Sequence, residues 1–494
     1  MQHSPVFLAF DLGAESGRLM AGHLQDNHWT MEEIHRFRNG TVPVGNHLHW
    51  DILRLWDEMQ TGLAKAGNTY RKDLVSLGVD TWGVDFGLLA EDGTLLGNPF
   101  HYRDARTEGM VETTSRVVSR EVLFSVTGIQ PMDINSLYQL ISMADTKVLE
   151  AADVFLNIPD LLNHWLCGRK ASEWTIASTT QCLDAERRNW AKDVLAKFNI
   201  PSGLFQPIVL PGTILESLSP PVATRAGCRS IPVVNVGSHD TASAIAAVPA
   251  GDPKYIFLSS GTWSLMGVEV KDPILTTKAL EYGFSNEGGV NGKYLLLKNI
   301  SGLWLLQECK RAWCVTEPQW TYDSLARSAQ EASAFASFVL PGDARFLSPG
   351  DMPGRIQAFC RDTGQTVPQS RGEIVRCIFE SLAMEYRRTA EQLTELLGFS
   401  IPVIHVIGGG SRNRLLNQFT ANATQRPVVA GPVEATALGN VIGQAVATGY
   451  LSSWEEGRQL ALRFEDLTRN SPAEEAAWDE AYSRYSELSV APRA

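Results

Sequence analysis

The chain has 494 residues, more than one hydrophobic core usually serves, so we expect at least two domains. Its 44% hydrophobic and 20% charged residues are typical of a globular protein. Acidic residues outnumber basic ones by 55 to 43, which gives a formal net charge of −12, and no run of Lys or Arg stands out against it. Nucleic acid and anionic membrane surfaces are therefore not expected as partners.

Cysteine usage and the N-terminus both predict a cytoplasmic protein. The seven cysteines form neither a CxxC pair nor a metal-ligand spacing, and even if Cys360 and Cys377 lie near one another, a reducing compartment favours free thiols. The N-terminal stretch lacks a basic segment, and Asp11 interrupts its apolar run, so it is not a signal peptide. The most apolar long stretch, residues 428–449, contains a glutamate, an asparagine and a glutamine and is a poor membrane span.

Strand and helix signals alternate along the first hundred residues, which predicts a mixed α/β fold. The helix is the clearest element, because Asp51 is a good N-cap and the apolar residues after it follow helical spacing. The predicted elements are strands at 6–12 and 18–24, the helix after Asp51, a strand at 75–79 that leads to Asp80, and a hairpin at 87–96 through Asp92-Gly93.

The second half repeats this order of signals. It predicts strands at 255–258 and 264–270, a long helix at 372–397 capped by Gly398, a strand at 403–407 followed by three glycines, and a helix that starts near Asn413. A strand that leads through glycines to a helix N-terminus is typical of a nucleotide site. The Pro-rich stretch before residue 250 places the boundary between two domains, 1–245 and 246–494, at about residues 243–252.

Two glycine turns, one in each half, are the most informative motifs. FDLGAESGR at 10–18 and LSSGTWSLMG at 258–267 each join two strand-like segments through small residues. Such turns let backbone N–H groups converge on anionic oxygens, and Ser or Thr adds hydroxyl donors. Two of them suggest two lobes that grip one polyphosphate, and Asp11 is then a carboxylate suited to Mg2+. The pattern predicts a phosphotransferase, although the GxGxxG and P-loop fingerprints are absent.

Asp240 follows an apolar strand-like run in VVNVGSHDTASA. It is either the N-cap of the Ala-rich helix that follows or a general base that accepts a hydroxyl proton during phosphoryl transfer. The two roles are compatible, because a helix N-terminus also stabilises a charged carboxylate. Thr262 similarly either donates its hydroxyl to a terminal phosphate or only satisfies a turn.

The segment DTWGVDF at 80–86 combines acidic, aromatic and glycine residues at the end of a predicted strand. It is either an aromatic part of the core with a turn or a sugar site, in which carboxylates contact hydroxyl groups and aromatic faces contact C–H patches. YRDAR at 102–106 has the same ambiguity, since Arg and Asp so close in sequence are more often a surface ion pair.

Taken together, these motifs resemble the FGGY family of carbohydrate kinases, over essentially the whole chain. The shared motifs are FDLGAESGR, DTWGVDF, YRDART, SHDTASA, LSSGTWSLMG, NEGG at 286–289, KNISGLWLLQE at 298–308 and IGGGSRN at 407–413. The resemblance implies two actin- and hexokinase-like (ribonuclease H-like) ATPase domains with a cleft between them. DTWGVDF further resembles the branch of the family that acts on the ketose L-rhamnulose.

The resemblance also implies site residues. Asp240 is the expected proton acceptor, and Asp11 is expected to face Mg2+. The sugar would be held by Gly83, His239, Asp240, Thr241 and Asn299, with Asp85 and Arg103 as further candidates from the motifs. ATP would be held by Ala14, Glu15, Ser16, Gly17, Arg18, Thr262, Gln307, Gly409 and Asn413. Glu15 has no assigned role, because a carboxylate in a phosphate-facing turn is repulsive unless it points outward or acts through the metal.

The implied reaction is phosphorylation of L-rhamnulose at its 1-hydroxyl by ATP in the cytoplasm, by a monomer or a homodimer, with no nucleic-acid or membrane partner. A kinase of the same fold for another ketose such as L-fuculose is one alternative. A nucleotide-dependent binding protein without sugar turnover is another, and the carboxylate at Asp240 and the DTWGVDF segment argue against it because a nucleotide switch needs neither.

Overall fold

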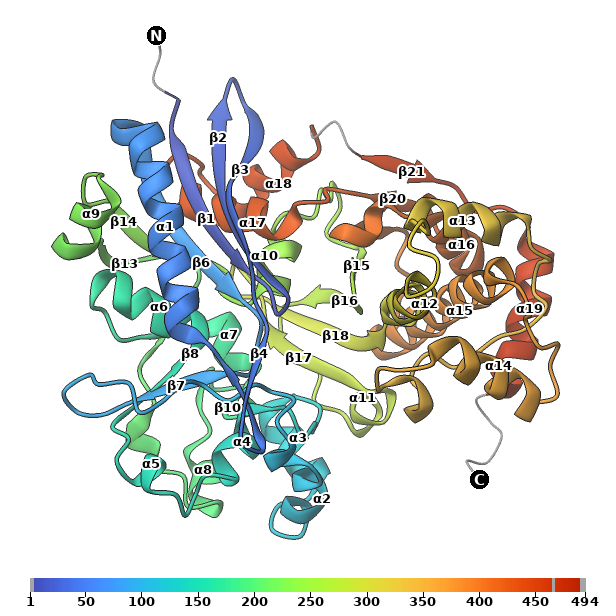
Figure 1. The fold of residues 1–494 in the computed structure, drawn as a ribbon, viewed down its shortest axis with the longest axis horizontal. Coiled ribbons are helices and arrows are strands. Elements are labelled where there is room, and N and C mark those ends of the chain that lie inside the picture. The colour runs from blue at the N-terminus through green and yellow to red at the C-terminus, as the bar shows by residue number, and fades with distance from the viewer. Residues whose placement is uncertain (1–3, 464–466, 489–494) are drawn as a thin grey trace. The chain divides into compact units, whose positions relative to one another are not determined.

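A computed structural model describes residues 4–463 and 467–488. The chain has a mixed α/β fold with two large sheets (Figure 1). It divides into two compact units: unit 1 comprises the described residues of 4–249, 269–296 and 435–463, and unit 2 comprises 250–268, 297–434 and 467–488. The first break falls after Pro249, and two later segments return to unit 1. The simple division at 245/246 stays a prediction.

Unit 1 is built on a six-stranded sheet with the order β13-β14-β6-β1-β2-β3. The strands are β1 (Val6–Leu12), β2 (Ser16–Gln25), β3 (His28–Arg38), β6 (Leu74–Thr81), β13 (Thr213–Ser217) and β14 (Pro232–Asn235). β1, β6 and β14 are parallel neighbours, whereas β2, β3 and β13 run antiparallel to theirs. The carboxyl ends of the three parallel strands therefore meet at one edge of the sheet.

Helices cover both faces of this sheet (Figure 1). Asp51 caps α1 (Ile52–Tyr70) by accepting a hydrogen bond from the backbone N–H of Arg54, as its sequence predicts. The buried face of α1 packs with the even-numbered side chains of β1 in one apolar cluster. α17 (Ala435–Ala447) packs against β1 and β6 and against α10 (Asp240–Ala246). β1 is consequently buried along its whole length.

The rest of unit 1 forms smaller sheets and short helices with a second apolar cluster. β7 (Phe86–Leu89) pairs antiparallel with β8 (Val154–Asn157). The predicted hairpin at 87–96 is only partly present, because a single bridge joins Leu89 to Leu95. The remaining elements are β4 (Thr41–Val44), β5 (His47–Trp50), β9 (Ser172–Glu173), β10 (Leu183–Asp184), β11 (Asn189–Trp190), β12 (Ile208–Val209), β17 (Phe284–Gly288), α2 (Met110–Ser115), α3 (Arg120–Thr127), α4 (Ser136–Ile141), α5 (Lys147–Glu150), α6 (Ile158–Cys167), α7 (Trp174–Ser178), α8 (Lys192–Lys197), α9 (Pro220–Ala226), α11 (Thr277–Tyr282) and α18 (Trp454–Ala461).

Unit 2 contains consecutive strands of the second sheet, in the order β16-β15-β19-β20-β21. These are β15 (Ile256–Ser260), β19 (Ile404–Ile407), β20 (Val428–Ala430) and β21 (Thr468–Asn470); β16 (Trp263–Val270) and a further strand, β18 (Tyr294–Ser301), have residues in both units. β15 is antiparallel to β16 and parallel to β19, and β19 is parallel to β20. The strands predicted at both ends of the second glycine turn are confirmed.

Six helices complete unit 2: α12 (Trp304–Cys314), α13 (Tyr322–Glu331), α14 (Met352–Asp362), α15 (Arg371–Leu397), α16 (Arg414–Thr424) and α19 (Glu475–Leu488). α15 begins with a capping box between Ser370 and Glu373, which was not predicted, and ends at Gly398 in the left-handed conformation, as the sequence predicts. Cys360 and Cys377 are free thiols within hydrogen-bonding reach of one another. None of the helices that the described residues form has the length and hydropathy of a membrane span.

Candidate active site

The edge where the parallel strands of unit 1 end carries three carboxylates. In the register of β1 and β6, Asp11 lies opposite Asp80. The backbone N–H of Thr81 donates to the carbonyl of Ser238 at 2.9 Å, which places the loop leading to Asp240 beside the same edge. In open α/β sheets, ligands bind outside the carboxyl ends of the parallel strands. The fold thus collects the predicted acidic residues where a ligand is expected.

Asp240 is the first residue of α10, and its N-cap is His239, so the alternative of Asp240 as the N-cap residue is wrong. Its carboxylate accepts a hydrogen bond from the Thr241 hydroxyl at 3.2 Å and is 33% exposed. Burial raises the pKa of Asp240, the charge of His239 opposes this, and Asp11 adds to it. The carboxylate therefore keeps an accessible oxygen, which a general base needs in order to reach a substrate proton.

His239 lies between two carboxylates. Its Nε2 atom is 3.5 Å from Oδ1 of Asp240, and its Nδ1 atom is 3.1 Å from Oε2 of Glu287. Burial opposes protonation of this imidazole, but the charge and hydrogen bond of Glu287 together with the charges of Asp240 and Glu173 outweigh it and raise the pKa of His239 to about 8. The resulting imidazolium favours the ionised form of Asp240.

Asp11 and Asp80 differ in their partners although they are neighbours. Asp11 forms an ion pair with Arg18 at 2.5 Å. Asp80 is completely buried, and its Oδ2 atom accepts a hydrogen bond from Asn440 at 2.6 Å. Burial raises the pKa of Asp80 well above its usual range, and the charges of Asp11 and Asp240 raise it further. Of the two, only Asp11 has a charged partner within ion-pair distance, although its side chain is only 11% exposed.

Buried polar groups fix the backbone just before Asp240. Glu173 accepts from the backbone N–H of Ser238 at 3.2 Å and from that of Thr175 at 2.9 Å. The Thr175 hydroxyl in turn accepts from the backbone N–H of His239 at 3.1 Å. Burial raises the pKa of Glu173 to about 7. These contacts fix the backbone between β14 and α10, and they therefore restrict the orientation of the Asp240 side chain.

The first glycine turn is a braced loop between β1 and β2. The backbone N–H of Gly13 donates to the carbonyl of Ser16 at 2.9 Å, and Asn39 contacts the carbonyls of Gly13 and Glu15 at 2.9 and 3.0 Å. Gly17 has no room for a side chain, because a Cβ atom there would lie 2.3 Å from the Phe37 ring. Glu15 is exposed.

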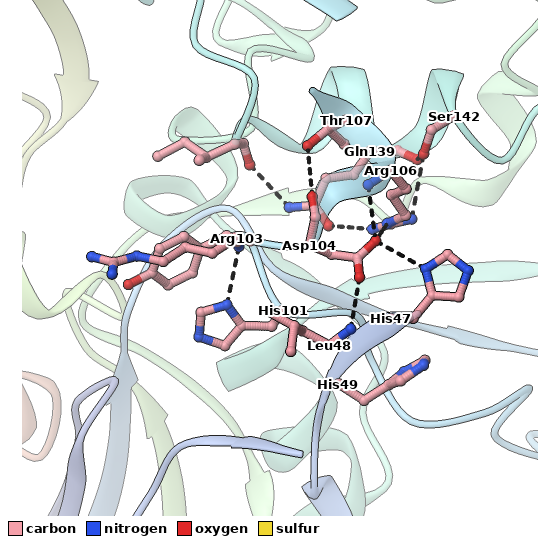
Figure 2. Close-up of polar contacts among 12 residues, drawn as sticks. His47, Leu48, His49, His101, Arg103, Asp104, Arg106, Thr107, Gln139 and Ser142 are labelled. Atoms are coloured by element: carbon pink, nitrogen blue, oxygen red, sulfur yellow. Dashed lines mark hydrogen bonds and ion pairs between the residues drawn. The ribbon is translucent and has the colours of Figure 1, made fainter. Parts of the chain in front are cut away.

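The DTWGVDF segment forms a turn beside this edge, but its second acid is enclosed. Asp85 is completely buried and accepts four hydrogen bonds from protein donors, which disfavours its predicted direct contact with a sugar. Asp104 and Arg106, expected as a possible surface ion pair, are instead buried neighbours with 3.6 Å between the Arg Nε and Asp Oδ1 atoms. Figure 2 shows Arg103 directed away from that cluster, and its guanidinium lies 5.6 Å from the Tyr102 ring centroid.

In unit 2, the second glycine turn packs against the start of α12. The backbone N–H groups of Leu303 and Trp304 donate to the carbonyls of Gly261 and Thr262 at 3.0 and 3.1 Å. The hydroxyl-bearing side chain of Thr262 is partly exposed. The carbonyl of Thr262 thus accepts a hydrogen bond within the turn, and the partial exposure of the residue is compatible with the phosphate contact considered for its hydroxyl.

Two of the three glycines after β19, Gly408 and Gly410, lie close to Ser260 at the end of β15. Gly410 approaches β15 so closely that a Cβ atom would lie 2.0 Å from the Ser260 hydroxyl, whereas nothing lies within 4 Å of a Cβ atom at Gly409. Asn413 caps α16 by accepting from the backbone N–H of Leu416 at 3.1 Å, as predicted. Gln307 on α12 and Asn299 on β18 are partly exposed and lie in the same unit.

Comparison with known proteins matches both halves of the chain to one family. Residues 6–246 match the N-terminal domain of the FGGY family of carbohydrate kinases, and residues 256–448 match the C-terminal domain. The chain belongs to the FGGY family of carbohydrate kinases. It is 45% identical to a rhamnulokinase of Bacteroides thetaiotaomicron over 97% of this chain and 98% of that protein. It is 42% identical to a rhamnulokinase of Oceanobacillus iheyensis over 93% and 97% of the two chains.

Solved structures of sugar kinases share the fold of this kinase. A ligand-bound xylulose kinase from Lactobacillus acidophilus aligns with a TM-score of 0.83 at 18% identity and covers 98% of this chain and 97% of its own. A Plasmodium falciparum glycerol kinase with ADP aligns with a TM-score of 0.81 at 15% identity over 99% of both chains. The predicted two-domain FGGY kinase fold is confirmed. The enzyme is a phosphotransferase with an alcohol group as acceptor, and its family uses ATP.

The potential metal ligands of this kinase suit an Mg2+ ion that binds together with the nucleotide. The described ranges contain no group of three or more His, Cys, Asp or Glu side chains arranged to hold an ion. Mg2+ usually takes one or two carboxylates and completes its shell with phosphate oxygens and water. Asp11, which is largely buried at the strand edge and balanced by Arg18, is a suitable single carboxylate.

Sequence reasoning missed several residues that the structure brings to the site. Glu287 belongs to a motif that supported the resemblance, but it had no role, and its pairing with His239 joins β17 to the start of α10. Glu173 and Asn39 act on backbone groups of the two predicted loops. The only sequence signal for Glu287 was its position beside two glycines in the NEGG motif. Backbone contacts over such long sequence distances leave no pattern in a single sequence.

Proposed function

We propose that this enzyme transfers the γ-phosphoryl group of ATP to the 1-hydroxyl of L-rhamnulose, giving L-rhamnulose 1-phosphate and ADP. The names and near-complete coverage of the relatives support the substrate. The observation that carries the chemistry is the partly exposed carboxylate of Asp240, which is held by its loop and lies beside a charged His239.

In the proposed reaction, O1 of the sugar bonds to the γ-phosphorus while the bond from that phosphorus to the bridging oxygen of ADP breaks. The O1 proton passes to a carboxylate oxygen of Asp240. Protein catalysis of phosphoryl transfer consists mainly of positioning and charge stabilisation, so a fixed carboxylate supplies most of what the acceptor needs. His239 keeps this carboxylate ionised before transfer.

The remaining contacts are proposed from the same set of residues. Gly83, His239, Thr241, Asn299 and Arg103 hold the sugar; Asp85 is completely buried and already accepts four hydrogen bonds from the protein, so a direct contact by Asp85 is the weakest member of this set. Ala14, Glu15, Ser16, Gly17 and Arg18 from unit 1 and Thr262, Gln307, Gly409 and Asn413 from unit 2 contact ATP. Asp11 holds Mg2+, which when bound supplies charge neutralisation for the phosphate oxygens.

The cellular setting is also a proposal. The cysteine usage of the chain favours a cytoplasmic enzyme, and the reaction would place it in L-rhamnose degradation, upstream of an enzyme that cleaves the phosphorylated ketose. A monomer and a homodimer are both compatible with the sequence.

A coupled ADP-release assay over a panel of sugars tests this proposal. We expect the highest kcat/KM with L-rhamnulose, a lower value with L-fuculose, and near-background rates with D-xylulose and glycerol. Phosphorus coupling to the C1 protons of the product by NMR should identify O1 as the site of transfer. A higher kcat/KM for L-fuculose or D-xylulose would refute the substrate, and no turnover of any sugar would refute the reaction.

A further inference from the structure

Two buried carboxyl groups lie in contact next to the loop that leads to Asp240. Asp160 is on α6, and Glu173 ends β9 and is the N-cap of α7. Both side chains are buried, and the backbone N–H of Glu173 donates to Oδ1 of Asp160 at 3.1 Å. Burial and a neighbouring like charge both disfavour the ionised form of a carboxyl group. One of the two groups is therefore expected to hold a proton.

The protein supplies unequal numbers of hydrogen-bond donors to the two groups. Oε2 of Glu173 accepts from the backbone N–H groups of Thr175 at 2.9 Å and Ile176 at 3.0 Å and from the Thr175 hydroxyl at 2.5 Å. It also accepts from the backbone N–H of Ser238 at 3.2 Å. Among the described residues, Asp160 accepts only the bond from Glu173, and its buried Oδ2 atom has no protein partner. Because hydrogen bonds to a carboxylate favour its charged form, these donors place the negative charge on Glu173 and the proton on Asp160.

The pKa values of the pair follow the same division. Burial, and to a smaller extent the charge of Glu173, raises the pKa of Asp160 well above its usual range. Burial raises the pKa of Glu173 only to about 7, because its hydrogen bonds oppose the effect of burial. Asp160 on α6 and His239 at the start of α10 are the ionisable groups that interact with Glu173, and Glu287 on β17 faces His239. Above about pH 7, Glu173 is thus the anion of the pair.

The charge of Glu173 reaches two consecutive residues of the loop. Glu173 binds the backbone N–H of Ser238 directly, and it takes the hydroxyl proton of Thr175. The Thr175 oxygen, oriented in this way, accepts from the backbone N–H of His239 at 3.1 Å. Asp240 is the next residue and begins α10. Since hydrogen bonds to an ionised acceptor are roughly twice as strong as those to a neutral one, a neutral side chain at position 173 would hold this backbone less firmly.

We propose that Glu173 is a positioning residue for the base Asp240 and acts as a buried anion, while its neighbour Asp160 holds the proton of the pair. This inference rests on the proposed function, because the effect of Glu173 on turnover passes through Asp240. It requires the charge of Glu173 as well as its shape, and it requires a neutral Asp160. Glu173 is then also a second negative charge, besides Glu287, that keeps His239 protonated.

The test compares two exchanges within the pair, Glu173→Gln and Asp160→Asn, each of which keeps the shape of the side chain and removes its ionisable group. We expect kcat with L-rhamnulose and ATP at pH 8 to fall at least tenfold in Glu173→Gln, because the loop loses its ionised acceptor. In Asp160→Asn, kcat should stay within about threefold of wild type, because the amide is as neutral as the protonated acid. The KM for ATP should change less than threefold in both. Glu186→Gln, at an exposed position of the same unit, is the matched control.

Two further measurements do not depend on turnover. The pKa of His239 by NMR of 13C-labelled histidine, assigned through the signal that His239→Gln removes, should fall in Glu173→Gln and stay at its wild-type value in Asp160→Asn. The infrared difference spectrum between wild type and Asp160→Asn at pH 8 should show the loss of one protonated carboxyl group. A residue that only fills space would change neither quantity in this pattern.

Thr175→Val and Thr175→Ser test the same contacts, in case Glu173→Gln does not fold. Serine keeps the hydroxyl that links Glu173 to the backbone of His239, whereas valine replaces it by a methyl group of similar size, so we expect a tenfold or larger fall in kcat with valine only. Equal values of kcat in Glu173→Gln and Asp160→Asn, a His239 pKa that Glu173→Gln leaves unchanged, or equal values of kcat in the two Thr175 variants would overturn the inference. A wild type that is inactive on L-rhamnulose, but in which Glu173→Gln still lowers the His239 pKa, would instead overturn the proposed function.

Discussion

The ion pair between His239 and Glu287 makes the stability of the enzyme depend on pH in a predictable way. Both residues are 7% exposed, and Nδ1 of His239 lies 3.1 Å from the Glu287 carboxylate. The difference between the pKa of about 8 and the ordinary value of 6.5 corresponds to about 2 kcal/mol in favour of the folded, protonated form. Because both groups are buried, solvent screening removes little of this.

Glu287→Gln should remove that contribution. Because the pKa of His239 is raised on folding, the loss of stability should appear at low pH and disappear at high pH. A histidine whose pKa is raised on folding adds its full stabilisation below pH 6.5 and loses it as the pH rises through about 8. We therefore expect the variant to be less stable than wild type by about 2 kcal/mol at pH 6 and the difference to close by pH 9. Loss of the charge on His239 should also move the acid limb of kcat/KM to higher pH, because Asp240 loses a neighbouring cation.

Urea unfolding at pH 6 and pH 9, followed by circular dichroism, measures the stability difference. NMR of 13C-labelled histidine gives the pKa directly; the chain has 10 histidines, and the signal that His239→Gln removes identifies the relevant one. Glu112→Gln, at an exposed position of the same unit, is the matched control. An equal loss of stability at both pH values, or a His239 pKa that Glu287→Gln leaves near 8, would refute this reasoning.

Two further predictions concern other parts of the site. Burial raises the pKa of Asp85 to about 6, so protonation of this carboxyl favours the folded state, and the free energy of unfolding relative to that of Asp85→Asn should fall as the pH rises from about 4 to 6; a difference that stays constant over this range in urea unfolding would contradict this. Gly410→Ala should destabilise unit 2 by about 1–3 kcal/mol and weaken ADP binding in calorimetry at least tenfold, because its Cβ atom would lie 2.0 Å from the Ser260 hydroxyl. Gly409→Ala, which has open space, should keep wild-type stability; equal stability of the two variants would count against the close approach.

Much of the fold could be predicted from local patterns. The start of α1 and both ends of α15 were predicted to within one residue, because helical periodicity and the caps at Asp51 and Gly398 act within a few residues. The hairpin at 87–96 was only partly correct, since β7 takes its partner from β8. That pairing depends on packing in the second apolar cluster of unit 1, and the local sequence around residues 87–96 contains no information about that packing.

The residues of the candidate site also fall into those that local sequence predicts and those that only the folded structure brings together. Asp11 and Asp240 could be predicted, because each follows a recognisable strand and the resemblance assigns it a role. Glu287 and Glu173 could not, since the first acts on a side chain and the second on a backbone N–H that only the folded chain brings near. Asp85 is a residue type suited to a sugar contact, and only the folded structure shows that it is completely buried and bound by four protein donors.

The account depends most on Asp240 as the proton acceptor. Asp240→Asn keeps the size of the side chain and its place at the start of α10, but it removes the basic oxygen. We predict that kcat with L-rhamnulose and ATP falls by roughly a hundredfold to ten-thousandfold, the usual contribution of a positioned general base, while the Kd for the sugar measured by calorimetry changes by less than about fivefold. A variant that binds the sugar and still turns over within a few-fold of wild type would contradict the account.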